Sequence, residues 1–239
     1  MDLKFPIDSY EMKARYAPAL LLSLPVLISL WSCYQVEYTA LSNVTNGILS
    51  IVIIYVLSVV IRSLSRRTEP KLWASWGGAP STVLVSWQDT RLGEELKGLY
   101  LQAVRDKLNL PVSSKEEEKP DPGRAAKLID QAFQRIKGII RQKDKEGLWA
   151  VANADYGFAR NLYGGRMLWL IVSSLTVLIS AYNLHFNFNN TILIGLIINL
   201  LLLFACIYFG WFILPEYTKQ VAFRYAEHAW ESFYNIVGK

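Results

Sequence analysis

The chain has 239 residues, of which 52% are hydrophobic and 19% are charged, and its formal net charge is +5. This composition is too apolar for an ordinary water-soluble domain of this length, so that class is excluded and membrane spans are sought first. The two cysteines, Cys33 and Cys206, lie in apolar stretches, which favours buried thiols over a disulfide, and no zinc-binding spacing occurs.

Two uncharged apolar stretches come first in the chain, at residues 16–34 and 44–61. Each has about the 17 to 25 residues that a helix needs to cross a hydrocarbon core roughly 30 Å thick. Because lipid offers no hydrogen-bond partner to the backbone, both stretches are predicted to be helices. Residues 1–61 therefore form the predicted N-terminal tail and first transmembrane hairpin.

The predicted cytoplasmic domain is mainly helical and spans residues 62–166. It contains 19 basic and 13 acidic side chains, so it accounts for the positive charge of the whole chain. Asp89 or Thr90 is predicted to cap a first helix that ends near Asn109. Residues 112–123, which are polar and contain prolines, are expected to be mobile.

A second helix of this domain is predicted to begin at Asp121 and Pro122, as cap and first helical position. Its cations include Arg135, Lys137, Arg141 and Lys145. The last three recur every four residues and so lie on one face of the helix. They form either a solvated face beneath acidic lipid headgroups or a binding site for a polyanion such as an oligonucleotide.

The segment that leads into the third span, residues 148–169, is predicted to be helical. Asn153, Tyr156 and Arg160 share one face of this helix, together with Gly157. That face is either a contact for a ligand or another subunit, or an extension of the span packed on its neighbours. Gly164 and Gly165 are expected to mark the boundary of the membrane.

The second transmembrane hairpin is predicted at residues 167–214, with spans at 167–184 and 191–214, again without charge. Residues 215–239 are predicted to form a C-terminal cytoplasmic helix. Its apolar positions recur every three or four residues: Phe223, Ala226, Trp230, Phe233 and Val237. This seam packs either on the protein's own cytoplasmic domain or on another subunit.

The distribution of cations predicts the topology. No Lys or Arg occurs between Arg15 and Arg62, or between Arg166 and Lys219. The positive-inside rule therefore places both termini and the middle domain in the cytoplasm. We expect a multi-pass membrane protein with both termini in the cytoplasm.

The stretch "KLWASWGGAPSTVLVSW", residues 71–87, has the small residues of a phosphate-binding loop but lacks the lysine that such a loop needs after its last glycine. Gly77 and Gly78 permit a reversal of the backbone, and Pro80 fixes the exit direction. The stretch is therefore predicted to be a structural corner, and residues 81–87 are either a strand or the start of a helix.

Three motifs, "YEMKARYAPALL", "LWASWGGAPST" and "NADYGFARNLYG", resemble those of a family of small bacterial four-span membrane proteins, the Hailong-type effectors of anti-phage defence. The family pattern has a second basic residue where Ala159 stands beside Arg160 in this chain. The resemblance implies an oligomeric, ion-conducting membrane protein controlled by a nucleotide that a companion nucleotidyltransferase makes.

The expected fold is thus an all-α membrane protein with four transmembrane helices in two hairpins, an inserted, mainly helical cytoplasmic domain and a C-terminal cytoplasmic helix. The expected function is an ion channel or effector gated by a nucleotide or oligonucleotide, and the alternative is a membrane-anchored scaffold without conductance. Seven residues are candidates for ligand binding: Arg135, Lys137, Arg141, Lys145, Asn153, Tyr156 and Arg160. No catalytic group, metal or cofactor is expected.

Four helices in one chain enclose no wide channel, so conduction requires a homo-oligomer, with a tetramer favoured. Ser29, Ser180 and Asn199 are among the polar side chains that could line water in such an assembly. On apolar helices, however, such side chains more often bond to the backbone or to a neighbouring helix.

Overall fold

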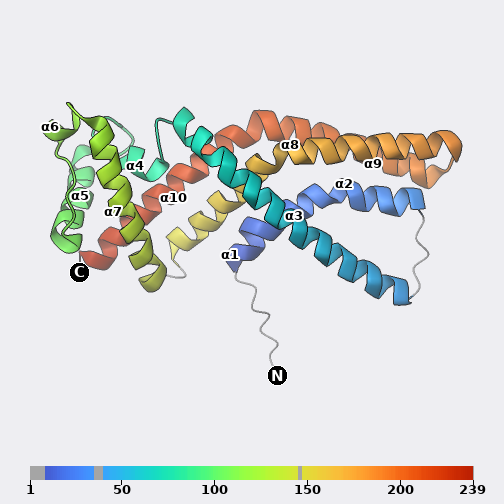
Figure 1. Cartoon of the computed structure of the whole chain (residues 1–239), viewed down its shortest axis with the longest axis horizontal. Coiled ribbons are helices and arrows are strands. Elements are labelled where there is room, and N and C mark those ends of the chain that lie inside the picture. The colour runs from blue at the N-terminus through green and yellow to red at the C-terminus, as the bar shows by residue number, and fades with distance from the viewer. Residues whose placement is uncertain (1–8, 35–39, 145–146, 239) are drawn as a thin grey trace, which may run out of the picture. The chain divides into compact units, whose positions relative to one another are not determined.

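A computed structural model describes residues 9–34, 40–144 and 147–238 of the chain (Figure 1), and within these ranges the secondary structure is helical, without a β-strand. The chain divides into two compact units. Unit 1 comprises residues 1–69 and 157–218, and unit 2 comprises residues 70–156 and 219–239.

Unit 1 contains the four uncharged apolar stretches of the chain. Its own elements are α1 (Ser9–Glu11), the π-helix η1 (Met12–Tyr16), α2 (Ala17–Tyr34), α9 (Asn190–Tyr208) and the π-helix η2 (Phe209–Ile213). Unit 2 has α4 (Pro80–Val85), α5 (Glu94–Leu108), α6 (Lys115–Glu118) and α7 (Pro122–Lys143). Three helices contain residues of both units, namely α3 (Ala40–Ser75), α8 (Leu148–Phe186) and α10 (Leu214–Val237).

Three helical stretches among the described residues are long and apolar enough to cross a membrane: Met12–Cys33, Leu148–Phe186 and Asn190–Val237. They contain the predicted spans 16–34, except for its last residue, 167–184 and 191–214. The remaining predicted span, residues 44–61, falls within α3. The side chains of residues 44–46, 48 and 49 lie outside the described part of the structure. The described chain is thus helical, and three of its helices are long and apolar enough to suggest a membrane protein.

Small residues allow the helices of unit 1 to approach closely, as membrane helices commonly do. A β-carbon on Gly164 of α8 would overlap the Cα atom of Ser65 in α3, and one on Gly195 of α9 would overlap the side chain of Ser32 in α2. The helices α2 and α9 accordingly lie side by side (Figure 1). Gly164 lies inside α8, where its missing side chain serves helix packing, and the membrane boundary expected at Gly164 and Gly165 stays a prediction.

Polar side chains in the apolar part of unit 1 bond to one another. The amide of Asn199 donates to the hydroxyl of Ser29 at 2.9 Å and to that of Ser180 at 3.2 Å, and all three residues are buried. This cluster joins α2, α8 and α9 within one chain. Of the two roles considered for these residues, the structure shows the bond to neighbouring helices.

Unit 2 has an aromatic core formed by α5, α7 and α10. Trp230 of α10 is fully buried, donates through Nε1 to the carbonyl of Ser81 at 2.9 Å, and lies with its ring centroid 5.7 Å from that of Phe133. Ala226 and Phe233 of the predicted seam are buried in the same core. The seam therefore packs on the protein's own domain.

The predicted start of α7 is confirmed, because the side chain of Asp121 accepts from the backbone N–H of Arg124 at 2.9 Å and Pro122 is the first helical residue. The predicted start of α5 is wrong. The helix begins at Glu94 after Gly93, since Asp89 instead accepts bonds from the backbone and side chain of Arg91.

The corner in the stretch 71–87 is confirmed. Gly77 and Gly78 have φ angles of 89° and 139°, which favour glycine, and Gly78 N–H donates to the carbonyl of Trp73 at 2.9 Å as α3 ends. Pro80 then opens α4, so the segment whose structure was left open is a helix up to Val85.

Candidate functional site

The cations predicted to form a stripe lie on α7, which buries its opposite, apolar face in the core of unit 2. Arg135 and Arg141 are exposed, and the ammonium of Lys137 lies 5.6 Å from the centre of the Phe133 ring. Lys145 lies outside the described residues. The three described cations thus share one helix, and the exposed side chains of Arg135 and Arg141 can meet an anionic ligand from solution.

The other predicted ligand residues, on α8, are divided between the two units. Tyr156 of unit 2 is buried, its hydroxyl accepts from Trp73 Nε1 at 3.0 Å, and its ring stacks on that of Tyr225 at 5.7 Å. Asn153, also in unit 2, is half-buried. Arg160 belongs to unit 1, where it donates to Glu69 at 3.0 Å. Tyr156 and Arg160 thus each contribute to packing within their own unit.

Unit 2 also contains a cavity that the sequence reading missed, with a volume of about 270 Å³. It is lined by Gly77, Thr82, Val83, Ser86, Gln88, Asp89, Glu118, Pro122, Ala126 and Ile129. The corner, α4 and the loop after it form one wall, and α6 and the first turns of α7 form the other. The corner segment therefore has a second role beyond reversing the chain.

Two residues of the cavity walls each have a polar atom that lacks a hydrogen-bond partner within the described structure. These atoms are Oγ1 of Thr82 and Oε2 of Glu118. Glu118 is only 3% exposed, and its other carboxylate oxygen accepts from the hydroxyl of Ser86. Burying a carboxylate oxygen without a partner is costly, so such an atom marks a place where a donor belongs. Thr82 and Glu118 both line the same cavity.

Lys97 of α5 holds the loop side of the cavity in place. Its side chain is buried, with the residue only 1% exposed, and its ammonium donates to the carbonyl oxygens of Ser86, at 2.7 Å, and Asp89. A buried ammonium is stable only when its protons are bonded, and these carbonyls provide that. The hydrogen bonds of Lys97 therefore hold residues 86–89 of the cavity wall in place.

The lining of the cavity defines the ligand that it suits. Among the described residues that line it, none is Lys or Arg, while Asp89 and Glu118 are carboxylates. A phosphate inside the cavity would meet only like charge, whereas an amine, amide or ring N–H would find the open oxygen of Glu118. Thr82 can donate to or accept from the same ligand, and Pro122, Ala126 and Ile129 offer an apolar surface.

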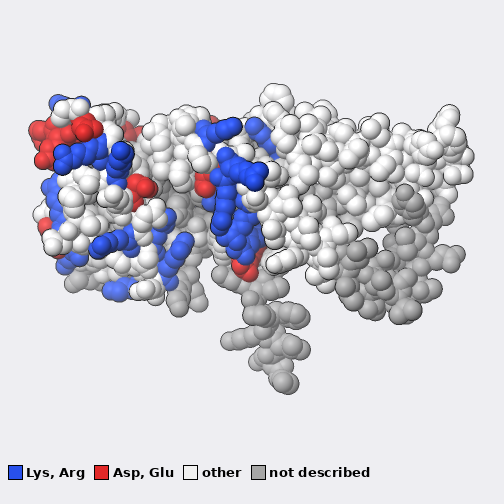
Figure 2. All heavy atoms as spheres, viewed as in Figure 1, with Lys and Arg blue, Asp and Glu red and all other residues white. Residues whose placement is uncertain are grey.

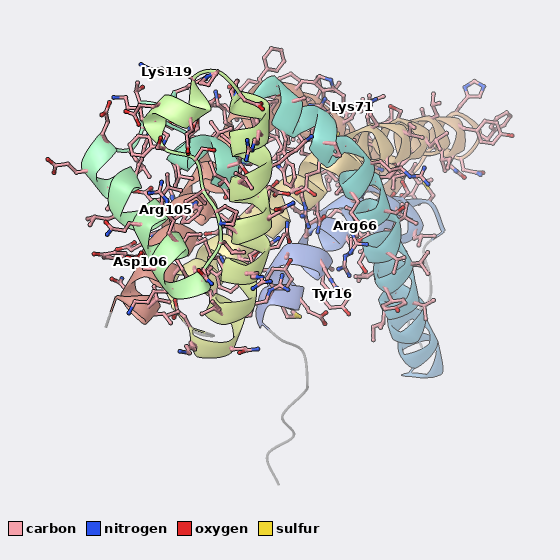
Figure 3. The ribbon with its side chains drawn as sticks, turned by 60° about the vertical axis from the view of Figure 1, so that its left-hand side comes forward. Tyr16, Arg66, Lys71, Arg105, Asp106 and Lys119 are labelled. Atoms are coloured by element: carbon pink, nitrogen blue, oxygen red, sulfur yellow. The ribbon has the colours of Figure 1, made fainter. Side chains whose placement is uncertain are left out.

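Glu118 lies in the acidic run "KEEEK", so its sequence context did not indicate a buried side chain. Residues 112–123, expected to be mobile, contain α6, whose cap is reciprocal: Ser114 Oγ accepts from the Glu117 N–H, and Glu117 accepts from the Ser114 N–H at 2.9 Å. This capping pattern in the sequence was the available signal. It turns Glu118 inward, while the next residue, Lys119, is exposed on the outer side of unit 2 (Figure 3).

Comparison with known proteins gives no relative from which to assign the cavity. No family model matches the chain, and no curated protein and no solved structure matches it either. The properties of the cavity therefore follow from its own residues.

Proposed function

We propose that the chain is an oligomeric membrane effector whose second unit senses a ligand from the cytoplasm. The observation that carries the proposal is the cavity of unit 2, with the open polar atoms of Thr82 and Glu118, in a chain that also has three membrane-spanning candidates. A pre-formed concave site with a few converging polar groups is typical of ligand binding.

The proposed ligand is a nucleotide or short oligonucleotide. A nucleobase presents amine and ring N–H donors, which suit Glu118, and its size suits a cavity of about 270 Å³. Lys137 follows the cavity residue Ala126 by eleven positions on the same helix, or about 16 Å along the axis. Lys137 is thus within reach of phosphates that follow a base held in the cavity, and Arg141 lies one turn further along the same face.

In the proposed assembly, four spans per chain cross the bacterial inner membrane, with both termini in the cytoplasm. A homo-oligomer, for which we favour a tetramer, conducts ions under control of the ligand. The resemblance described above supports a role in anti-phage defence, with a companion nucleotidyltransferase as the source of the ligand.

One observation favours a second candidate, a membrane-anchored binding module without conductance. Ser29, Ser180 and Asn199 bond to one another inside unit 1, so these side chains contribute no polar wall to a water-filled pore. A channel would have to place water against other residues.

Conductance of the purified full-length protein in planar bilayers, with and without defined oligonucleotides, tests the proposal. We expect a ligand-dependent change in conductance. Glu118→Gln should raise the ligand concentration that gives half of this change at least tenfold. Glu116→Gln is the matched control, since Glu116 is exposed on the same helix. A protein that binds oligonucleotides but never conducts would establish the anchored module instead, and the absence of both would contradict the ligand proposal.

A further inference from the structure

Four arginines of unit 1 surround the point where three of its elements meet. The side chain of Asn161 in α8 donates to the carbonyl of Ala14 in η1 at 2.7 Å, and the hydroxyl of Ser65 in α3 lies 3.3 Å from the carbonyl of Asn161, to which it donates. The arginines are adjacent in sequence to these contacts or one turn away: Arg15, Arg62, Arg66 and Arg160. The packing of η1, α3 and α8 thus gathers the four cations.

The π-helix contributes to this arrangement. In η1 the backbone is wider than in an α-helix, and Ala14 lies so close to Gly157 that a β-carbon there would approach the methyl of Ala14 to 2.8 Å. No larger residue than glycine fits at position 157. Arg15 is therefore held beside α8 and the arginines of α3.

The cluster carries more positive charge than its partners neutralise. Arg15 pairs with Glu11, and Arg160 pairs with Glu69 at 3.0 Å. Arg62 and Arg66 have no carboxylate partner within the described part of the chain. Burial and then the charges of Arg15 and Arg66 lower the pKa of Arg62, as expected for a guanidinium that lies among other cations.

The cluster lies where the apolar surface of unit 1 begins. Val59 and Val60, just before Arg62, are 53% and 40% exposed, and Leu20, five residues after Arg15, is 43% exposed. Five residues of helix correspond to about 7.5 Å. Figure 2 shows Lys and Arg gathered over α1 and α3, next to a surface of unit 1 that carries almost no charge. Figure 3 labels Arg66 on α3 and Tyr16 at the end of η1, the two elements that meet here.

We propose that the arginine cluster is a specific site for the phosphodiester headgroup of an anionic lipid. Guanidinium groups match the oxygens of a phosphate in a two-pronged geometry, and basic pockets between helices on the cytoplasmic side of a membrane bind such headgroups. The exposed valines and leucine then hold the acyl chains of the same molecule, which a free phosphate would lack. The proposal does not depend on the ligand of unit 2 or on conductance.

Native mass spectrometry of the full-length protein, mixed with phosphatidylglycerol or phosphatidylcholine in detergent, tests the lipid site. We expect retained phosphatidylglycerol to exceed phosphatidylcholine, and Arg62→Gln with Arg66→Gln to lower its apparent affinity about 30-fold, at roughly fivefold for each cation. Arg135→Gln with Arg141→Gln removes the same charge from unit 2 and is expected to leave retention unchanged. Equal retention of the two lipids, or an equal loss in both double variants, would overturn the proposal.

A single variant and a competition with inorganic phosphate complete the test of the lipid site. Arg66→Gln alone, at an exposed position, is expected to fold and to lower the affinity about fivefold. Inorganic phosphate at millimolar concentration is expected not to displace the lipid. Displacement by phosphate would show a site for a free anion, and a normal affinity in a folded Arg66→Gln protein would also contradict the proposed site.

Discussion

The two units differ in where their buried polar side chains lie. In unit 1 the side chains of Ser29, Ser180 and Asn199 bond to one another among helices whose outer surface is apolar, although Oδ1 of Asn199 has no partner within the described structure. In unit 2 Thr82 and Glu118, each with an oxygen that also lacks such a partner, line a cavity. A polar cluster enclosed between apolar helices joins helix to helix, whereas polar side chains that line a cavity can also meet a ligand.

The units also differ in what fills their interiors. Unit 2 is packed with large rings, among them Trp230, Phe133 and Tyr100. Unit 1 brings its helices together over small residues, including Gly164 and Gly195. Hydrophobic burial stabilises the first, whereas close backbone contact stabilises the second because lipid is as apolar as the interior.

The largest effect is expected in the aromatic core. Trp230→Ala should lower the free energy of unfolding of unit 2 by about 3–5 kcal/mol, because it leaves a cavity and removes the hydrogen bond to the carbonyl of Ser81. Denaturant titration of the detergent-solubilised protein measures this. Trp31→Ala is the control in unit 1, where the residue is 40% exposed, and should change stability much less. Similar losses in both variants would remove the contrast between the two interiors.

A smaller loss is expected where the helices of unit 1 touch. Gly164→Ala should cost about 1–3 kcal/mol, since the new methyl meets the backbone of Ser65, which cannot move as a side chain can. Gly138→Ala, on the exposed part of α7 with nothing within 4 Å, should stabilise by up to about 1 kcal/mol. Thermal unfolding in detergent compares the two. A stable Gly164→Ala protein would refute close packing at this point.

The smallest effect concerns the polar cluster of unit 1. A double-mutant cycle of Asn199→Ala and Ser29→Ala should give a coupling energy of about 0.6 kcal/mol, the usual value for hydrogen bonds between membrane helices. Stability in detergent gives the four free energies. A coupling near zero, with each single variant unchanged, would show that these side chains do not hold α2 and α9 together.

Apolar spacing predicted the helices well. The uncharged stretches and the Asp121–Pro122 start follow from local rules, so α7 and the spans on α2, α8 and α9 could be read from the sequence. The start of α5 could not, because Asp89 has an alternative partner in Arg91 and Gly93 takes the cap position instead. A side chain such as that of Asp89 caps a helix only where no neighbouring donor bonds to it instead.

The candidate site was harder to predict than the fold. The cations of α7 follow from spacing along one helix, but the cavity depends on Thr82 and Glu118, which lie 36 positions apart. Their proximity results from how α4 and α6 both pack on α7. Glu118 and the exposed Glu116 are glutamates of the same acidic run, so the sequence alone does not distinguish them. Only the tertiary contacts of Glu118 do.

The π-helix at Met12–Tyr16 marks a place where the chain can tolerate a change of length. Its turn carries one residue more than an α-helical turn, and losing one would let the backbone relax into the regular ladder. The flanking residues would then keep nearly the same direction, because the wider turn only accommodates the extra residue. Glu11 and Arg15 would lie three positions apart, a spacing at which side chains still meet on a helix, so the loss of one residue between them would preserve their pair.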